Sequence, residues 1–285
     1  MALSGHTTPY AVLGHPIGHT LSPVMHNASF EALGLDAIYL AFDVAPENLM
    51  TVLPAMQQMG FGGVNLTVPL KEVAFAQLPQ LDASAQLLGA VNTVAFGENG
   101  LKGYNTDGIG FLTALQEAFG PCIEQESVFV LGTGGAGRAV ALVCAGAGAS
   151  GIVLTDIDEE RAGRVAAEIR ERYPDCTVQV VRGPATVSAA QSADLIVQST
   201  PIGMKPDDPS PLAPEAFHAG QKAFDLIYMY PETPFLAAAR EADAQIANGL
   251  GMLLHQGAAA YNIWSGQDAD TAAMRRALEQ AVYGS

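Results

Sequence analysis

Lys71 and Asp107 are candidates for acid–base chemistry, in which a side chain takes up or gives back a proton. Lys71 is the only lysine or arginine among the first 101 residues, and Asp107 leads into an apolar helix pattern. Removing a hydride from a secondary alcohol requires a nearby group to take the hydroxyl proton. A lysine can do this when burial or a partner tunes its pKa, and a carboxylate can orient it. The structural alternatives are a solvated surface lysine and a helix-capping aspartate, which is the commoner role for an acid in this position.

Further polar side chains gather in stretches that also contain tight turns. These stretches are "GHPIGHTLSPVMHN" (14–27) with Thr20 and Ser22, "NLTVPLK" (65–71), "GAVNTV" (89–94) with Asn92, and "GYNTDGIGF" (103–111) with Asn105, Thr106 and Asp107. Loops at the carboxyl ends of parallel strands bind small ligands in α/β folds, so we expect these stretches to meet at one site. The first stretch also holds three histidines, but no carboxylate supports them, and a metal site is not expected.

A glycine-rich stretch, "VFVLGTGGAGRAV", has the spacing of a dinucleotide-binding turn. Gly132, Gly134 and Gly137 lie between a strand pattern and a helix pattern. A second strand follows and ends at Asp156, 19 positions after Gly137. In such turns the glycines allow a tight turn, close approach of a pyrophosphate and close helix packing, and the helix N-terminus attracts the phosphates. The complete order of elements predicts an NAD- or NADP-binding domain rather than a purely structural turn.

The acidic stretch "LTDIDEER" (154–161) bears on which dinucleotide is bound. A carboxylate at Asp156 would accept hydrogen bonds from the ribose hydroxyls of NAD. It would repel the 2′-phosphate of NADP by a few kcal/mol at about 5 Å. The acids at 158–160 also suit a helix N-terminus, whose dipole favours them. The sequence therefore favours NAD, and NADP remains the alternative if Arg161 or Arg164 reaches back to the phosphate.

Apolar patterns predict an α/β fold that starts twice along the chain. Strands are expected at 10–14, 37–44, 62–68, 127–131, 151–155, 177–181, 194–200 and 222–228, and helices at 22–34, 46–60, 107–120, 134–148 and 158–173. We expect Ser22 to cap the first helix and Gly34 to end it. The alternation predicts parallel sheets. Two closing helices, near 250–265 and 269–283, are not assigned to either half by their pattern.

The composition limits the class of partner. The 285 residues are 49% hydrophobic and 15% charged, which suits a compact α/β protein. No apolar run reaches the roughly 18 residues of a membrane span. The formal charge of −16 opposes binding to nucleic acid or to an anionic membrane. The three cysteines are far apart, and the N-terminus lacks a secretory pattern, so a cytoplasmic location without a disulfide framework is expected.

Taken together, these stretches resemble the shikimate dehydrogenase family, including its quinate/shikimate dehydrogenase branch. The resemblance spans nearly the whole chain, through "GHPIGHTLSPVMHN", "NLTVPLK", "GAVNT", "YNTDGIGF", "GTGGAGRA", "STPIGM", "DLIYMYPETPFL" and "NGLGMLLHQGAAAYNIWSG". It implies a substrate-binding domain of residues 1–106 and 248–285, to which the C-terminal helices return. It also implies a Rossmann-type NAD(P)-binding domain of residues 107–247. The implied reaction is reversible oxidation of the C3 hydroxyl of shikimate to 3-dehydroshikimate, with hydride passing to the nicotinamide and no metal required.

The resemblance also implies a role for each matching position. Lys71 and Asp107 would be the catalytic pair. The substrate-binding residues would be Thr20, Ser22, Asn65, Thr67, Asn92, Tyr228 and Gln256. The dinucleotide-binding residues would be Gly132, Gly134, Gly135, Ala136, Gly137, Asp156, Asp158, Thr200, Met204, Gly249 and Met252.

Two departures from the family pattern concern the substrate and the cofactor. Thr20-Leu21-Ser22 stands where the family usually has Ser-x-Ser, which adds a methyl group at the carboxylate end, where quinate and shikimate differ. Asp156-Ile157-Asp158 replaces the Asn-Arg-Thr of NADP-specific members, and this replacement is similar to the NAD-using branch. The expectation is therefore NAD, with shikimate and with quinate as a candidate second substrate, in a monomer or homodimer. The alternatives are a strictly NADP-dependent shikimate dehydrogenase and a catalytically silent ligand sensor.

Overall fold

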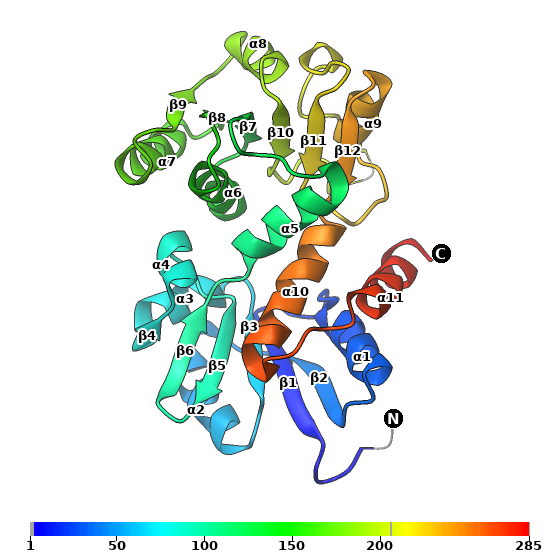
Figure 1. The fold of residues 1–285 in the computed structure, drawn as a ribbon. Coiled ribbons are helices and arrows are strands. Elements are labelled where there is room, and N and C mark those ends of the chain that lie inside the picture. The colour runs from blue at the N-terminus through cyan, green and yellow to red at the C-terminus, as the bar shows by residue number, and fades with distance from the viewer. Residues whose placement is uncertain (1–2, 206, 285) are drawn as a thin grey trace. The chain divides into compact units, whose positions relative to one another are not determined.

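The computed structural model describes residues 3–205 and 207–284, which form two compact units. The first unit comprises Met1–Gly110 and Leu253–Ser285, and the second comprises Phe111–Met252. Two helices, α5 (Asp107–Phe119) and α10 (Leu250–Ser265), contribute residues to both units. Both units are built from alternating strands and helices (Figure 1), so the predicted two-domain α/β fold is confirmed. No helix in the described ranges is long and apolar enough to cross a membrane.

A six-stranded sheet in the order β2-β1-β3-β5-β6-β4 forms the first unit. Its strands are β1 (Thr8–Gly14), β2 (Ala37–Asp43), β3 (Gly63–Leu66), β4 (Gln80–Leu81), β5 (Thr93–Gly97) and β6 (Gly100–Tyr104). β1 pairs in parallel with β2 and β3, but β5 is antiparallel to both β3 and β6. The expectation of a wholly parallel sheet is therefore wrong here. Only Glu98 and Asn99 join β5 to β6, and so short a link permits a hairpin and no helical crossover.

The helices of the first unit include three that begin close to predicted positions and two that were not predicted. The first three are α1 (Ser22–Ala32), α2 (Leu49–Gln58) after the 3₁₀ turn η1 (Pro46–Asn48), and α11 (Thr271–Tyr283), and the other two are α3 (Leu70–Gln77) and α4 (Ala83–Leu88). Ser22 is the first residue of α1 and not its cap, because the cap position is Leu21 and no side chain bonds the first turn. Pro23 supplies the pre-set backbone angle of the first turn, and Gly34 ends the segment at φ +66°. The Ser22 hydroxyl is thereby left for other contacts.

The C-terminal helices pack on the first unit. Tyr261 and Trp264 of α10 join an aromatic cluster with Tyr10, Phe30 and Tyr39. The Trp264 indole occupies the space where a side chain at Gly63 would stand and donates from Nε1 to the Val94 carbonyl at 3.0 Å. α11 packs against α1. Aromatic packing thus holds α10, and packing against α1 holds α11, where the sequence pattern had assigned neither helix.

The second unit holds a wholly parallel sheet in the order β9-β8-β7-β10-β11-β12. Its strands are β7 (Ser127–Leu131), β8 (Gly151–Thr155), β9 (Thr177–Val180), β10 (Leu195–Gln198), β11 (Lys222–Asp225) and β12 (Gln245–Asn248). Its own helical segments are α6 (Gly135–Gly146), α7 (Glu159–Arg172), α8 (Ala185–Gln191), the 3₁₀ turn η2 (Pro214–Ala216) and α9 (Pro234–Glu241). Numbered along the unit, the strand order is 3-2-1-4-5-6, which is that of a Rossmann domain. Ligands bind such sheets where the strand order reverses, between β7 and β10.

Candidate active site

Lys71 and Asp107 form an ion pair in the first unit. Lys71 lies in the first turn of α3 and Asp107 begins α5, and Nζ lies 2.7 Å from Oδ2. Both side chains keep partial access to solvent. The backbone amide of Asp107 donates to Oδ1 of Asn105 at 2.9 Å, so Asn105 provides a cap-like contact at the start of α5. The Asp107 carboxylate is directed to Lys71, which places a charged donor and an acceptor side by side.

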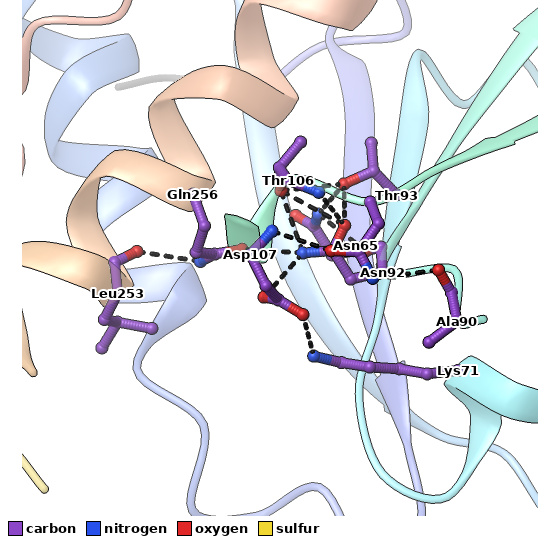
Figure 2. A network of polar contacts seen from close by, with 10 residues as sticks. Asn65, Lys71, Ala90, Asn92, Thr93, Thr106, Asp107, Leu253 and Gln256 are labelled. Atoms are coloured by element: carbon purple, nitrogen blue, oxygen red, sulfur yellow. Dashed lines mark hydrogen bonds and ion pairs between the residues drawn. The ribbon is translucent and has the colours of Figure 1, made fainter. Parts of the chain in front are cut away.

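Asn92 connects this pair to the rest of the site (Figure 2). Its Nδ2 lies 2.9 Å from Oδ1 of Asp107, 2.9 Å from Oγ1 of Thr106 and 3.4 Å from Oε1 of Gln256. Its Oδ1 accepts from the Thr106 amide at 2.8 Å. An amide nitrogen carries two hydrogens, so three acceptors cannot all be satisfied at once. The longest contact is the weakest, and Oε1 of Gln256 is therefore the oxygen most available to a ligand hydroxyl.

Asn65 lies beside Asn92 and is almost fully buried. Its Nδ2 donates to the Asn92 carbonyl and to Oγ1 of Thr93, each at 3.0 Å. Its Oδ1 accepts from the phenol of Tyr39 at 2.6 Å. Both amide hydrogens of Asn65 are thus committed to the protein, and its oxygen keeps one lone pair for a ligand.

Three hydroxyl residues complete the predicted substrate set in this unit. Oγ1 of Thr20 donates to Oγ of Ser22 at 3.3 Å. Thr67 lies in the turn between β3 and α3, where its amide donates to the Leu13 carbonyl and its carbonyl accepts from the Leu70 amide. That turn sets the start of α3 and so the position of Lys71. The predicted residues brought into the first unit are Thr20, Ser22, Asn65, Thr67, Lys71, Asn92, Asp107 and Gln256.

Sequence reasoning missed two residues that contact the predicted site: Gly110, which lies against Gln256, and Tyr39, which bonds Asn65. A side chain at Gly110 would stand 2.7 Å from the backbone nitrogen of Gln256, so this glycine lets the segment carrying Gln256 approach closely. Tyr39 lies within an apolar strand pattern, and that pattern predicts only that its side chain packs in the core. No signal in the sequence links its phenol to Asn65.

The glycine-rich turn of the second unit has the geometry expected of a dinucleotide site. Gly132 has φ +92°, and a side chain at Gly137 would stand 2.0 Å from the Gly132 carbonyl oxygen. Gly134 and Gly135, at the start of α6, have nothing within 4 Å of a side-chain position. That open space lies at a helix N-terminus, where backbone N–H groups attract a pyrophosphate. The residues at this turn therefore fit a bound dinucleotide.

Asp156 is turned inward rather than presented to a ribose. Its Oδ2 accepts from the amide and the hydroxyl of Thr133 at 2.6 and 2.8 Å, and its Oδ1 accepts from the Asp158 amide at 2.8 Å. Arg161 adds contacts at 2.6 Å to Oδ1 and 3.3 Å to Oδ2. The Asp156 side chain is only 4% exposed, whereas that of Arg161 is 40% exposed. Burial would raise the pKa of Asp156, but Arg161 and these donors hold the pKa well below its usual range.

The hydrogen bonds from Thr133, Asp158 and Arg161 occupy the Asp156 lone pairs that would be needed to accept bonds from a ribose. A carboxylate offers about four lone-pair sites, and Asp156 already receives five contacts. The geometry thus removes the main physical support for NAD over NADP. Thr133 was not anticipated, although it stands inside the glycine motif.

The remaining predicted residues of the second unit follow β10, β11 and β12, and Met252 among them lies in the first turn of α10. Thr200 follows β10, and Oε1 and Nε2 of buried Gln198 bond the Thr200 amide and the Ile202 carbonyl. Tyr228 follows β11 and belongs to this unit, and its burial raises the pKa of its phenol. A side chain at Gly249 would stand 2.1 Å from the Leu226 carbonyl oxygen, so close backbone approach explains that glycine. The predicted site residues that lie in the second unit are Gly132, Gly134, Gly135, Ala136, Gly137, Asp156, Asp158, Thr200, Met204, Tyr228, Gly249 and Met252.

The described residues include no cluster of side chains that could bind a metal ion. Within residues 3–205 and 207–284, no three His, Cys, Asp or Glu side chains lie close enough to hold an ion. The polar groups that gather around Asn92 are amides, hydroxyls and the Lys71–Asp107 ion pair. They can bind hydroxyls and move a proton.

Two family descriptions match segments of the chain. "Shikimate dehydrogenase substrate binding domain" matches residues 12–94, and "Shikimate 5'-dehydrogenase C-terminal domain" matches residues 249–279. Among curated relatives, the shikimate dehydrogenase (NADP(+)) of Moorella thermoacetica is 44% identical over 96% of this chain and 94% of that protein.

Solved structures of the same kind match over nearly the full length. The shikimate 5-dehydrogenase of Thermus thermophilus, in complex with NADP(H) and shikimate, is 39% identical with a TM-score of 0.85, covering 96% of this chain and 99% of that chain. The shikimate 5-dehydrogenase of Listeria monocytogenes, in complex with shikimate and NAD, is 31% identical with a TM-score of 0.91, covering 98% of both chains. The similarity thus extends to both units, and these two structures differ in the dinucleotide bound.

Proposed function

The chain belongs to the shikimate dehydrogenase family, and from that premise we propose that it catalyses the reversible oxidation of shikimate to 3-dehydroshikimate with NADP. The observation that carries the proposal is the contact of 2.7 Å between Nζ of Lys71 and Oδ2 of Asp107. It lies beside Asn92 and Gln256, whose amide groups can bind ring hydroxyls. A catalytically silent sensor has no need of such a proton-transfer pair.

The proposed chemistry moves one hydride and one proton. The bound dinucleotide supplies the hydride acceptor at its nicotinamide. In the oxidation, the hydroxyl proton at C3 passes to the neutral amine of Lys71 as the carbon–hydrogen bond breaks. In the reduction, the Lys71 ammonium returns that proton to the ketone oxygen. Asp107 orients Nζ, and Asn92 holds the second oxygen of Asp107 in place.

The arrangement at Asp156 supports NADP as the preferred dinucleotide. Arg161 neutralises Asp156 and remains the more exposed of the two, so a guanidinium stands where a free carboxylate was expected. Nε and Nη2 of Arg161 bond Asp156, so the donor left for a phosphate would be Nη1, and a charged N–H donor binds a phosphate strongly. The names of the curated relatives point the same way. The expectation of NAD is not supported, and the alternative with Arg161 as the phosphate contact becomes the proposal.

Initial rates test the function and the cofactor together. Shikimate is oxidised with NADP or NAD at matched subsaturating concentrations, and the same pair of assays is repeated with quinate. The proposal expects kcat/KM to be highest for shikimate with NADP. Faster reduction of NAD would restore the first expectation, and turnover of quinate would add that second substrate. Binding of shikimate without any turnover would identify a sensor instead.

A further inference from the structure

Asn105 is a buried asparagine whose side chain bonds two separate segments of the first unit. It lies in the turn between β6 and α5 and is only 5% exposed. Its Nδ2 donates to the Ala90 carbonyl at 2.9 Å, and its Oδ1 accepts from the Asp107 amide at 2.9 Å. Its own backbone amide donates to Oγ of Ser84, in the first turn of α4, at 3.1 Å. One residue thus joins the start of α5 to the segment that follows α4.

The segment held in this way, residues 90–92, contacts both members of the proposed catalytic pair. The Val91 amide donates to the Lys71 carbonyl at 3.0 Å. Nδ2 of Asn92 donates to Oδ1 of Asp107 at 2.9 Å (Figure 2). The segment therefore bonds the backbone that carries Lys71 and also the carboxylate of Asp107. A shift of this segment relative to α5 would change the distance of 2.7 Å between Nζ of Lys71 and Oδ2 of Asp107.

Asp107 is connected to residues 90–92 at two points. Asn105 connects its backbone, because one side-chain amide joins the Asp107 N–H to the Ala90 carbonyl. Asn92 connects its carboxylate. An asparagine and an aspartate each rotate about two side-chain bonds, so the second connection keeps a fixed geometry only while the first holds the two backbones together. Loss of the Asn105 amide would therefore loosen the Asp107 carboxylate without removing any atom that contacts it.

We infer that Asn105 is a positioning residue for proton transfer, which holds residues 90–92 against the start of α5 and so keeps Lys71 and Asp107 within hydrogen-bonding distance. This inference rests on the proposed function and adds a residue to it. Asn105 acts through these neighbours, because its side-chain oxygen and nitrogen both bond the protein backbone. Such positioning matters because a displacement of about 1 Å at a reacting group can cost about a hundredfold in rate.

The test compares Asn105→Ser with Asp270→Ala. Serine can still accept from the amide two residues along the chain, but its shorter side chain gives up the bond to Ala90. We expect Asn105→Ser to lower kcat for shikimate oxidation about tenfold, the size expected from losing one buried hydrogen bond that orients a reacting group. Asp270→Ala removes a bond of 2.8 Å to the Ala273 amide at the start of α11, so it weakens the same unit at a distance from residues 90–92. It should leave kcat within about twofold.

The solvent deuterium isotope effect on kcat separates positioning from a purely structural turn. This ratio of rates in H₂O and D₂O does not depend on the amount of folded enzyme, so partial misfolding leaves it intact. It should increase in Asn105→Ser, because a poorly aligned Lys71 and Asp107 make proton transfer limit the turnover more strongly. A residue that only stabilises the turn would leave the isotope effect of the unmodified protein unchanged.

A double-mutant cycle with Asp107→Ala tests the route of the effect. If Asn105 acts by positioning Asp107, Asn105→Ser should lower the residual kcat by less than about twofold once Asp107 is replaced. Three results would each overturn the inference and leave the proposed function standing: an equal loss of kcat in Asp270→Ala, an unchanged kcat and isotope effect in Asn105→Ser, or a full tenfold loss in the Asp107→Ala background. Absence of shikimate turnover in the unmodified protein would overturn both.

Discussion

Nη2 of Arg161 lies 2.6 Å from Oδ1 of Asp156, so the loop after β8 presents a guanidinium beside an already satisfied carboxylate. The helix α7 begins with Glu159, and Arg161 stands in its first turn, from which its side chain folds back across the loop. A second acid, Asp158, caps the helix by accepting from the Arg161 amide at 3.0 Å. The electrostatic character of this corner therefore depends on Arg161.

Replacing Arg161 by alanine is expected to lower kcat/KM for NADP at least about tenfold and to change that for NAD by less than about threefold. The variant removes a charged donor worth about 1.5–3 kcal/mol and leaves the negative charges of Asp156 and Asp158 without the arginine that neutralises them. Initial rates with both dinucleotides and saturating shikimate measure the effect. Arg164→Ala is the control, since Arg164 lies on the same helix, is largely exposed and pairs with Glu160 at 3.8 Å. An unchanged preference in Arg161→Ala, or an equal loss in the control, would contradict the assignment.

Replacing Lys71 by alanine is expected to reduce kcat for shikimate oxidation by about 10²–10⁴, the usual contribution of a positioned acid or base. Binding of shikimate should weaken much less, because amides and hydroxyls hold the ring. Lys102→Ala provides a matched control, as Lys102 pairs with Asp82 at 3.1 Å in the same unit. The measurement is steady-state kcat alongside shikimate affinity. Normal kcat in Lys71→Ala would exclude Lys71 from proton transfer.

Sequence reasoning located the polar groups of the first unit because they stand in short loops that contain Gly and Pro. Lys71, Asn92 and Asp107 each follow such a turn, and the structure brings them within hydrogen-bonding distance. Spacing alone could not show which contacts form, since these residues come from separate elements. The Rossmann order of the second unit was equally readable, because its glycines and strands occur in a fixed sequence.

The parts that sequence could not give depend on side-chain direction. Asp156 directly follows strand β8, as expected, but its carboxylate bonds Thr133 and Arg161. The spacing of residues along the chain does not reveal the direction of that side chain. Tyr39 has the pattern of a core residue, and its phenol meets a partner 26 positions away. The hairpin of β5 and β6 was missed because its two-residue link joins two short strands that have no strong apolar alternation. Tertiary packing decided each of these cases.

His26 is expected to make the first unit less stable as pH falls below 6.5. The imidazole is fully buried, and neither ring nitrogen has a hydrogen-bond partner among the described residues. Burial lowers the pKa of His26 to about 3 from 6.5. Between these values the unfolded chain binds a proton that the folded protein does not, so the free energy of unfolding falls by up to about 1.4 kcal/mol per pH unit.

His26→Phe should remove this pH dependence while keeping an aromatic ring against Tyr39. Gly257 leaves little room, because a side chain there would stand 3.2 Å from Nε2 of His26, so we expect the larger ring to change stability by a constant amount at every pH. The informative quantity is the difference in unfolding free energy between variant and parent, measured in urea from pH 7 to pH 5. It should shift by about 2 kcal/mol in favour of the variant. A difference that stays constant with pH would show that His26 is not the group responsible.

Asp225 is expected to make the second unit less stable as pH rises, which is opposite to the effect of His26. Burial raises the pKa of this carboxyl to about 6 from 3.8, although Thr233 donates to Oδ2 at 2.6 Å and the Ile227 amide donates to Oδ1 at 3.0 Å. Between pH 3.8 and 6 the folded protein holds a proton that the unfolded chain has lost, so stability declines as pH rises through this window. Asp225→Asn cannot ionise and should gain about 2.4 kcal/mol relative to the parent between pH 4 and pH 7. Urea unfolding of both proteins at those two pH values measures the gain. The His26 and Asp225 effects overlap between pH 3.8 and 6 and change the free energy of unfolding in opposite directions. The unmodified protein should therefore show a weaker dependence of this free energy on pH than either His26→Phe or Asp225→Asn. A steep dependence in the unmodified protein would contradict the two assignments.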